Sequence, residues 1–414
     1  MSKQLLVPTP KKYIIKMHST IGAADARDDS AYLSESFVDT GELQILKDMD
    51  DPRCIIVGRT GAGKTALLEE LKRQKELFIY LDPTTLALSR VSDSKVLRQY
   101  SQLGANMDNF YKLLWRHIFV IEIIKKHYKI DNINKRNSFV NELKSKTFDN
   151  KSKQDARNYI IQWSDSFWKE TEHRTIELTK TVEEKLSGKL GFTLPPASLL
   201  GATGSVEKEK SISEQEKSKF VVGSEEIVDQ QLIKTLADVM TLLEEDLLKD
   251  KKKLYYIGID KLDEGWVDDT FKNELIRAML ETVRDFNSRF SNVKIVLALR
   301  KDLIDRIYRT GFTPGYQREK IESLYLNLTW HEDDLQNMLG IRLERYFAKI
   351  YSSHEAPTLK QIFTDKKIDD KSPIDYLLER TMLRPRDAIL FFNECMRVAA
   401  GTSKINNIDL KNAE

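Results

Sequence analysis

The octapeptide G-R-T-G-A-G-K-T at residues 58–65, called the glycine loop below, constrains the fold of this chain more than any other part. Glycine permits the positive φ angles and close backbone approach that a chain needs to surround a phosphate group with amide N–H groups. A β-branched and apolar run at residues 53–58 leads into the loop and predicts a buried strand. Leucines at helical spacing follow the loop and predict a helix packed on a sheet. A bound phosphate would meet the positive end of that helix.

Two side chains of the glycine loop have the chemistry of a nucleotide site. Lys64 is placed to reach the β- and γ-phosphates of a nucleotide, and the Thr65 hydroxyl is placed to bind Mg²⁺. The residues expected to contact the nucleotide are Gly58, Arg59, Thr60, Gly61, Ala62, Gly63, Lys64, Thr65 and Ala66. The alternative interpretation is a glycine turn that binds nothing.

Four further apolar runs predict strands, so the sequence contains five in all. They lie at residues 77–81, 253–260, 293–300 and 322–328. Helical patterns separate the strands, which predicts an α/β protein with a doubly wound parallel sheet. Roughly 170 residues lie between the second and third strands, where a simple crossover needs a few tens. The chain therefore carries a large insertion, at about residues 86–250.

The insertion is predicted to be mostly helical, because its Glu-, Lys-, Leu- and Ile-rich stretches have helical spacing. Those stretches are residues 106–128, 134–147, 153–187 and 224–249. Residues 185–219 are rich in Gly, Pro and Ser, which predicts a mobile loop or a hairpin that orders on a partner. The length favours two compact units. We expect an arm at residues 1–30, a sheet domain with its insertion at 31–330, and a helical lid at 331–414.

Acidic residues at the end of the third strand extend the candidate site. Asp260 ends that strand, where a carboxylate would hold the water shell of a phosphate-bound Mg²⁺; the alternative is a polar residue in a turn. Asp263 and Glu264 follow one turn later, and either could orient and deprotonate an attacking water. A solvated acidic turn is the alternative for these two residues.

Two arginines are candidates for sensing the γ-phosphate. Arg300 ends the fourth strand, where a cation could neutralise charge on that phosphate; the alternative is a surface ion pair. Arg384 and Arg386 open a helix in the sequence R-P-R-D, since proline favours the first helical turn. Arg386 is preferred as the arginine that reaches the nucleotide when the lid closes. The tryptophans are interpreted as packing residues, with Trp266 as a brace for the acidic turn.

Composition argues against several classes of protein. The 66 basic and 64 acidic side chains leave a net charge of +2, so no global field favours nucleic acid or a membrane surface. Two distant cysteines and six histidines without ligand spacing argue against a disulfide framework and a zinc site. The sequence has no signal-peptide pattern and no stretch long enough to span a bilayer. We expect a cytoplasmic protein that makes no membrane contact.

Taken together, five motifs make the sequence resemble bacterial P-loop ATPases of the additional-strand (ASCE) class, close to the STAND and KAP-type NTPases. The motifs are F-V-D-T-G-E-L (37–43), the glycine loop, I-G-I-D-K-L-D-E-G-W (257–266), V-L-A-L-R (296–300) and L-R-P-R-D (383–387). The resemblance covers residues 34–83 and 253–395 and leaves the insertion uncovered. It implies a sheet in the order 5-1-4-3-2, Mg²⁺ and ATP as ligands, and a helical lid that reports the state of the nucleotide.

The resemblance also implies roles for single residues. Asp260 matches the aspartate that holds Mg²⁺, Arg300 the sensor at the end of the fourth strand, and Arg386 the second sensor. Lys261 departs from the family pattern, since relatives usually have an acidic residue there. Either Asp263 or Glu264 takes over the role of base, or hydrolysis is slow and the protein works as an ATP-occupancy switch.

Many members of these families act in signalling or antiphage defence, and their ATPase controls a separate effector. The sequence therefore predicts a Mg²⁺-dependent, ATP-hydrolysing switch that forms a homo-oligomer and regulates a partner protein. A second hypothesis is a nucleic-acid-binding loader or remodeller that grips phosphates through Lys249, Lys251, Lys252 and Lys253. A third is a P-loop phosphotransferase, which the acidic turn disfavours because it suits water better than a second substrate.

Overall fold

The structure is a computed structural model, and it describes residues 13–86, 107–147, 151–163, 232–310, 318–351 and 356–414, together with residues 88, 91, 93 and 98. The loop predicted at residues 185–219 lies outside the described residues, as do parts of the helical stretches predicted at 153–187 and 224–249.

Five strands form one sheet, and each corresponds to a predicted strand. They are β1 (Ile55–Gly58), β2 (Phe78–Leu81), β3 (Tyr255–Ile259), β4 (Val293–Arg300) and β5 (Tyr325–Asn327). The order across the sheet is β2-β3-β4-β1-β5, which reads 5-1-4-3-2 from the β5 edge. The β2–β3 and β3–β4 pairs are parallel. The predicted α/β class with a parallel sheet is therefore confirmed.

The central strands are buried along their whole length. All residues of β1 and β3 are buried, and β4 is buried except at its last residue, Arg300. Parallel strands that are covered on both faces have near-continuous apolar sequences, as I-I-V-G (55–58) and I-V-L-A-L (295–299) do here. The fourth strand was predicted with the bounds that the structure has.

The chain divides into two compact units, and the division passes through β1 and β5. One unit comprises Met1–Lys47, Ile56–Gln74 and Leu326–Glu414, and the other comprises Asp48–Ile55 and Lys75–Tyr325. We call them the loop unit and the insertion unit and describe each by itself.

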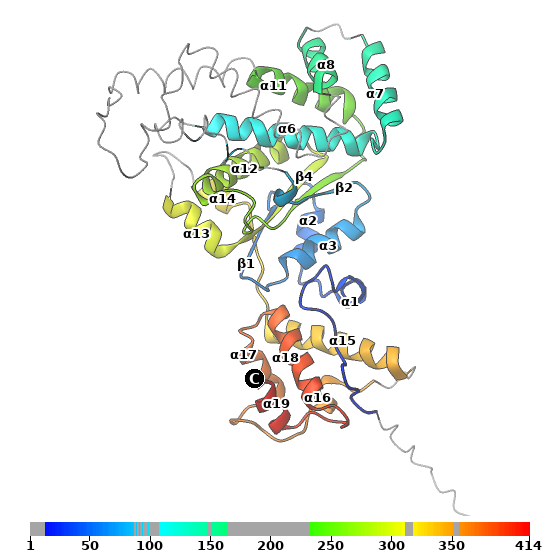
Figure 1. Cartoon of the computed structure of the whole chain (residues 1–414), viewed down its shortest axis with the longest axis vertical. Coiled ribbons are helices and arrows are strands. Elements are labelled where there is room, and N and C mark those ends of the chain that lie inside the picture. Colours follow the sequence, from blue (N-terminus) through cyan, green and yellow to red (C-terminus); the bar gives the residue numbers. More distant parts are fainter. Residues whose placement is uncertain are drawn as a thin grey trace, which may run out of the picture. The chain divides into compact units, whose positions relative to one another are not determined.

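The loop unit contains the helix that follows the glycine loop and the helices at both ends of the chain (Figure 1). Its helices are α1 (Ser30–Ser36), α2 (Glu42–Lys47), α3 (Lys64–Gln74), α15 (Glu332–Tyr351), α16 (Leu359–Ile362), α17 (Pro373–Arg380), α18 (Pro385–Val398) and α19 (Asn407–Ala413). The apolar faces of α15 to α19 share one core, which includes Leu343, Leu377 and Phe392.

Residues from the N-terminal end of the chain belong to that same core. Ile15 and Ile21 are fully buried among the side chains of α15 to α19. The Ile15 N–H donates to the Thr402 carbonyl, and the Ile15 carbonyl accepts from the Gly401 N–H, both at 2.8 Å. Residues 13–36, called the N-terminal segment below, are thus packed against the C-terminal helices.

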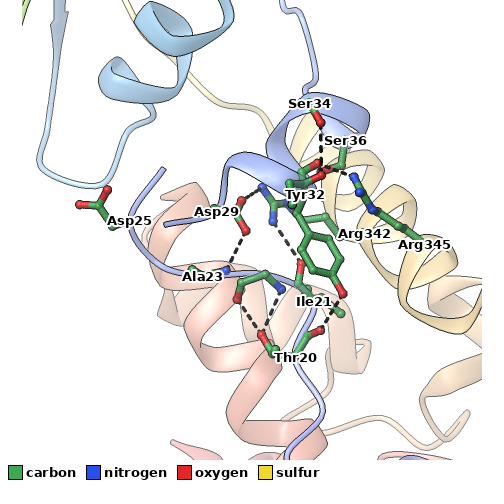
Figure 2. A network of polar contacts seen from close by, with 12 residues as sticks. Thr20, Ile21, Ala23, Asp25, Asp29, Tyr32, Ser34, Ser36, Arg342 and Arg345 are labelled. Atoms are coloured by element: carbon green, nitrogen blue, oxygen red, sulfur yellow. Dashed lines mark hydrogen bonds and ion pairs between the residues drawn. The ribbon is translucent and has the colours of Figure 1, made fainter. Parts of the chain in front are cut away.

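Polar contacts fix this segment to α15 (Figure 2). The Arg342 guanidinium donates to the Ile21 carbonyl at 3.1 Å and to the Asp29 carboxylate at 2.6 Å. The other Asp29 oxygen accepts from the Ala23 N–H at 2.8 Å. Arg345 donates to the Tyr32 carbonyl at 3.1 Å, one turn further along α15.

Among its described residues, the insertion unit contains helices besides its strands. Its helices are η1 (Pro83–Thr85), α6 (Asp108–His127), α7 (Ile133–Ser145), α8 (Lys151–Trp163), α11 (Leu232–Leu242), the π-helix η3 (Leu243–Leu247), α12 (Asp269–Arg289), α13 (Lys301–Thr310) and α14 (Arg318–Glu322). Helices α6 and α12 lie side by side (Figure 1). Arg116 pairs with Asp285 at 3.0 Å, and Trp115 Nε1 donates to the Leu275 carbonyl at 2.9 Å. Among the described residues, no helix is both long and apolar enough to cross a bilayer.

Candidate functional site

The glycine loop connects β1 to α3 and has the backbone that its glycines predict. Gly61 and Gly63 have φ angles of 79° and 94°, which only glycine adopts readily. Helix α3 begins at Lys64, and its first turn closes with the Leu67 N–H donating to the Gly63 carbonyl at 3.0 Å. The N-terminal end of α3, with its partial positive charge, therefore lies at the loop.

Lys64 is held by the loop itself. Its ammonium donates to the Arg59 carbonyl at 2.9 Å and to the Gly58 carbonyl at 3.2 Å. Carbonyl oxygens carry only partial charge, so a polyphosphate would compete with them effectively for the ammonium. The glycine loop thus holds the Lys64 ammonium at the place where the sequence predicts phosphate binding.

Two elements from the C-terminal part of the chain contact consecutive carbonyls of the loop. The Arg386 main-chain N–H donates to the Gly61 carbonyl at 3.3 Å. The Trp330 indole Nε1 donates to the Ala62 carbonyl at 2.9 Å. A Cβ at Gly61 would lie 3.1 Å from Arg386 Nε, so this glycine is required for close approach as well as for its φ angle.

Of the two arginines at the start of α18, the structure brings Arg386 to the loop. Arg384 pairs with Asp387 at 3.3 Å within its own helix turn. The Arg386 side chain is about 40% exposed beside Gly61, and its Nε lies 3.7 Å from the Asp387 carboxylate. Arg386 therefore lies next to the glycine loop, whereas Arg384 is engaged within its own helix turn.

A cavity of about 170 Å³ lies beside the loop, within the loop unit. The glycine loop, parts of residues 23–42, Trp330, Arg342 and Arg386 line it. Most of the remaining lining is apolar, including Leu328, Met338 and Ile389, and apolar walls with a few polar groups are typical of small-molecule sites. A phosphate group at the loop would therefore have a partly open cavity next to it for the rest of a ligand.

In the insertion unit, a turn follows β3 and carries the predicted acidic residues. Asp260 is 6% exposed, and its carboxylate accepts from the Lys261 N–H at 2.9 Å. Lys261 has a φ of 62°, an uncommon conformation for a residue with a side chain. Its ammonium pairs with Asp82 at 3.0 Å. Burial opposes ionisation of Asp82, but hydrogen bonds from Thr84 and Lys261 outweigh it and lower the pKa of this carboxyl.

Asp263 and Glu264 differ in their partners. The Asp263 carboxylate pairs with Arg300 at 3.2 Å, and Arg300 also pairs with Asp302 at 2.8 Å. The hydrogen bond from Arg300 lowers the pKa of Asp302. Glu264 is exposed, and within the described part of the chain its carboxylate has no hydrogen bond or ion pair. Arg300 thus lies in a network with one of the two candidate bases, and the other is left accessible.

The predicted residues therefore form two groups. The glycine loop and Arg386 lie together in the loop unit, whereas Asp260, Asp263, Glu264 and Arg300 lie together in the insertion unit. Among the described residues, no three His, Cys, Asp or Glu side chains are grouped to hold a metal ion.

The structure adds one residue that the sequence did not single out. Trp330 was interpreted as a packing residue, but it donates a hydrogen bond to the glycine loop. In the sequence, Trp330 is simply a tryptophan between a predicted strand and a predicted helix. That position does not reveal its contact with Ala62, which is 268 positions away in the chain.

Comparisons with known proteins match the C-terminal helices and, weakly, the whole chain. The family described as the FunZ-associated C-terminal helical domain matches residues 333–414, which hold α15 to α19. The transposon gamma-delta 80.3 kDa protein of Escherichia coli (strain K12) is 24% identical over 424 residues, covering 97% of this chain and 50% of that protein. The chain thus spans half the length of this relative, and Arg386 lies within the residues that match the family model.

Proposed function

We propose that this protein is a Mg²⁺-dependent switch that binds and hydrolyses ATP. The observation that supports this function best is the glycine loop itself, with its two positive-φ glycines, the Lys64 ammonium and the start of α3 beside a cavity. In this proposal, loop amides and Lys64 hold the phosphates, and the apolar cavity holds the nucleoside.

Thr65 and Asp260 are the residues that we propose for Mg²⁺. When bound, Mg²⁺ neutralises charge on the phosphate oxygens. Asp260 suits this role because it is buried at the end of a strand and its carboxylate oxygen is oriented by the Lys261 N–H. Parallel strands present their carboxyl ends at one edge of a sheet, which is where ligands bind in such folds.

Glu264 is the group that we favour for activating water. Asp263 is paired with Arg300, and a carboxylate that is engaged with a guanidinium is a weaker base. Lys261, which stands where relatives have an acid, is paired with Asp82 and cannot accept a proton as an ammonium. The proposed role of Arg300 is to hold Asp263 and to meet charge that develops on the γ-phosphate.

The switch part of the proposal follows from the contacts between the glycine loop and the C-terminal helices. One main-chain hydrogen bond from α18 and one indole hydrogen bond from Trp330 reach two consecutive loop carbonyls. A phosphate that changes the loop would therefore act on the start of α15 and α18. We propose that this change regulates a partner protein in a homo-oligomeric cytoplasmic assembly, in a process such as antiphage defence.

A nucleic-acid-binding ATPase is the second candidate. Lys251, Lys252 and Lys253 form an exposed turn before β3, and the E. coli relative is named as a transposon protein. Phosphate contacts from such lysines would give binding that weakens steeply with salt. Retention of DNA or RNA at low salt, lost in a Lys251→Glu, Lys252→Glu variant, would favour this function over a protein partner alone.

Phosphate release from ATP tests the leading proposal. The full chain with Mg²⁺ should release inorganic phosphate, and Lys64→Ala should abolish the release. Lys72→Ala is the matched control, because Lys72 is exposed on the same helix and pairs with Glu69 at 3.0 Å. Release that persists in Lys64→Ala would contradict the proposal, and transfer of phosphate to another acceptor would favour the phosphotransferase alternative.

A further inference from the structure

Trp330 contacts the glycine loop in a way that packing does not require. It lies between β5 and α15, and its indole N–H donates to the Ala62 carbonyl at 2.9 Å. Its ring lies 3.9 Å from the position that a Cβ on Gly63 would occupy. The tryptophan therefore meets the loop by a directed hydrogen bond and by ring contact at the next residue.

This bond determines the direction of the amide group that follows. In a planar trans peptide, the carbonyl of one residue and the N–H of the next point in opposite directions. Holding the Ala62 carbonyl toward the indole thus turns the Gly63 N–H to the other side of the peptide plane. Gly63, with its φ of 94°, has the widest conformational freedom of any residue type, so its peptide needs an external constraint.

The neighbouring carbonyl of Gly61 has a constraint of a different kind. It accepts from the main-chain N–H of Arg386, so this bond involves no side chain. The Ala62 carbonyl, by contrast, is held by the indole side chain of Trp330. Trp330 also lines the cavity beside the loop, so its bond stays next to any ligand there.

We propose that Trp330 is a positioning residue of the phosphate site, which orients the Gly63 amide toward a bound polyphosphate. The inference rests on the proposed nucleotide function and adds to it a residue that acts through the loop. Binding of the inorganic part of the ligand should then depend on the indole N–H, whereas contacts with the nucleoside should not.

The experiment compares Trp330→Phe, which keeps an aromatic ring but removes the N–H, with Trp115→Phe. Trp115 is the matched control because its indole donates to the Leu275 carbonyl at the same distance of 2.9 Å, in the insertion unit. Affinities for Mg²⁺-ATP and for inorganic tripolyphosphate are measured on the full chain by calorimetry. Loss of the hydrogen bond to the loop in Trp330→Phe should lower the affinity for both ligands by about 3- to 10-fold. Trp115→Phe should leave both affinities unchanged.

The outcomes separate the inference from the function on which it rests. If Lys64→Ala abolishes binding and Trp330→Phe binds like the wild type, the positioning role is wrong and the nucleotide site stands. If Trp330→Phe weakens ATP but not tripolyphosphate, the ring acts on the nucleoside, which also overturns the inference. If the wild-type chain binds neither ligand, the proposed function fails together with it.

Discussion

Asp29 and Arg342, which are 313 positions apart in the chain, form an ion pair of 2.6 Å in which each side chain is only 3% exposed (Figure 2). Gly22 passes directly over this pair with a φ of 136°, and a Cβ there would collide with both side chains. The pair therefore attaches the N-terminal segment to α15 beside the cavity that borders the glycine loop. The two ends of the chain act as one folded body in this unit.

Loss of one partner of this ion pair should destabilise the loop unit strongly. Arg342→Met leaves the Asp29 carboxylate buried without its cation, which costs about 3–5 kcal/mol in comparable cases. The free energy of unfolding, measured with a chemical denaturant, checks this. Glu35→Ala is the control, since Glu35 pairs with Arg345 at 3.0 Å but is about 65% exposed and should contribute less than about 1 kcal/mol. Equal effects of the two variants would contradict the account.

Gly61 should not tolerate a side chain. Gly61→Ala places a Cβ 3.1 Å from Arg386 Nε at a φ of 79°, so it adds both strain and a close contact. We expect weaker binding of Mg²⁺-ATP and a loss of stability of about 1–3 kcal/mol. Gly401→Ala has a comparable φ of 87° but open space around it. It should lose stability by backbone strain alone and keep its nucleotide affinity.

Glu264 should matter for turnover more than for binding. Removing a general base typically lowers the rate by about 10²-fold or more, so Glu264→Gln should slow phosphate release while ATP affinity is kept. Asp263→Asn should have the smaller effect on the chemical step, because its carboxylate is engaged with Arg300. Steady-state rates and affinities of both variants decide between them. The reverse order of effects would assign the base to Asp263.

Stability should decrease below pH 6.5 because of His127. Burial, reinforced by the charges of Lys253 and Lys146, lowers the pKa of His127 from 6.5, and its Nδ1 lies 2.6 Å from the Tyr255 hydroxyl. The unfolded chain therefore takes up a proton before the folded chain does. The contribution of neutral His127 to the free energy of unfolding is fully present above pH 6.5. It declines as the pH falls toward the pKa of His127 in the folded state.

Denaturation midpoints at pH 7.5 and 5.5 test this assignment. His127→Gln should reduce the difference between the two midpoints, because the group that takes up the proton on unfolding is gone. His331→Gln is the control, since His331 is exposed at the start of α15. A difference that is as large in His127→Gln as in the wild type would rule out His127 as its source.

The sheet was predictable because its signals are local. The runs that form β1 and most of β4 are apolar and rich in β-branched residues, which is the pattern of strands covered on both faces. The turn chemistry of the glycine loop likewise depends on neighbouring residues, and the positive φ angles of Gly61 and Gly63 follow from it. The helices of the insertion were visible from their 3.6-residue period.

The features that could not be predicted from the sequence depend on contacts between residues far apart in the chain. Nothing near Ile15 or Ile21 shows that they fill a core made by residues more than 300 positions later. The pairing of Lys261 with Asp82 is equally invisible along the chain, although it explains how a lysine is accommodated after Asp260. Single directed bonds such as that of Trp330 have no periodicity to detect.

Calorimetric titration of the full chain with Mg²⁺-ATP tests the central claim most directly. We predict saturable binding with one site per chain, lost in Lys64→Ala and kept in Lys72→Ala. The absence of any heat with ATP and with GTP, under conditions where the chain is folded, would contradict the claim that the glycine loop holds a nucleotide.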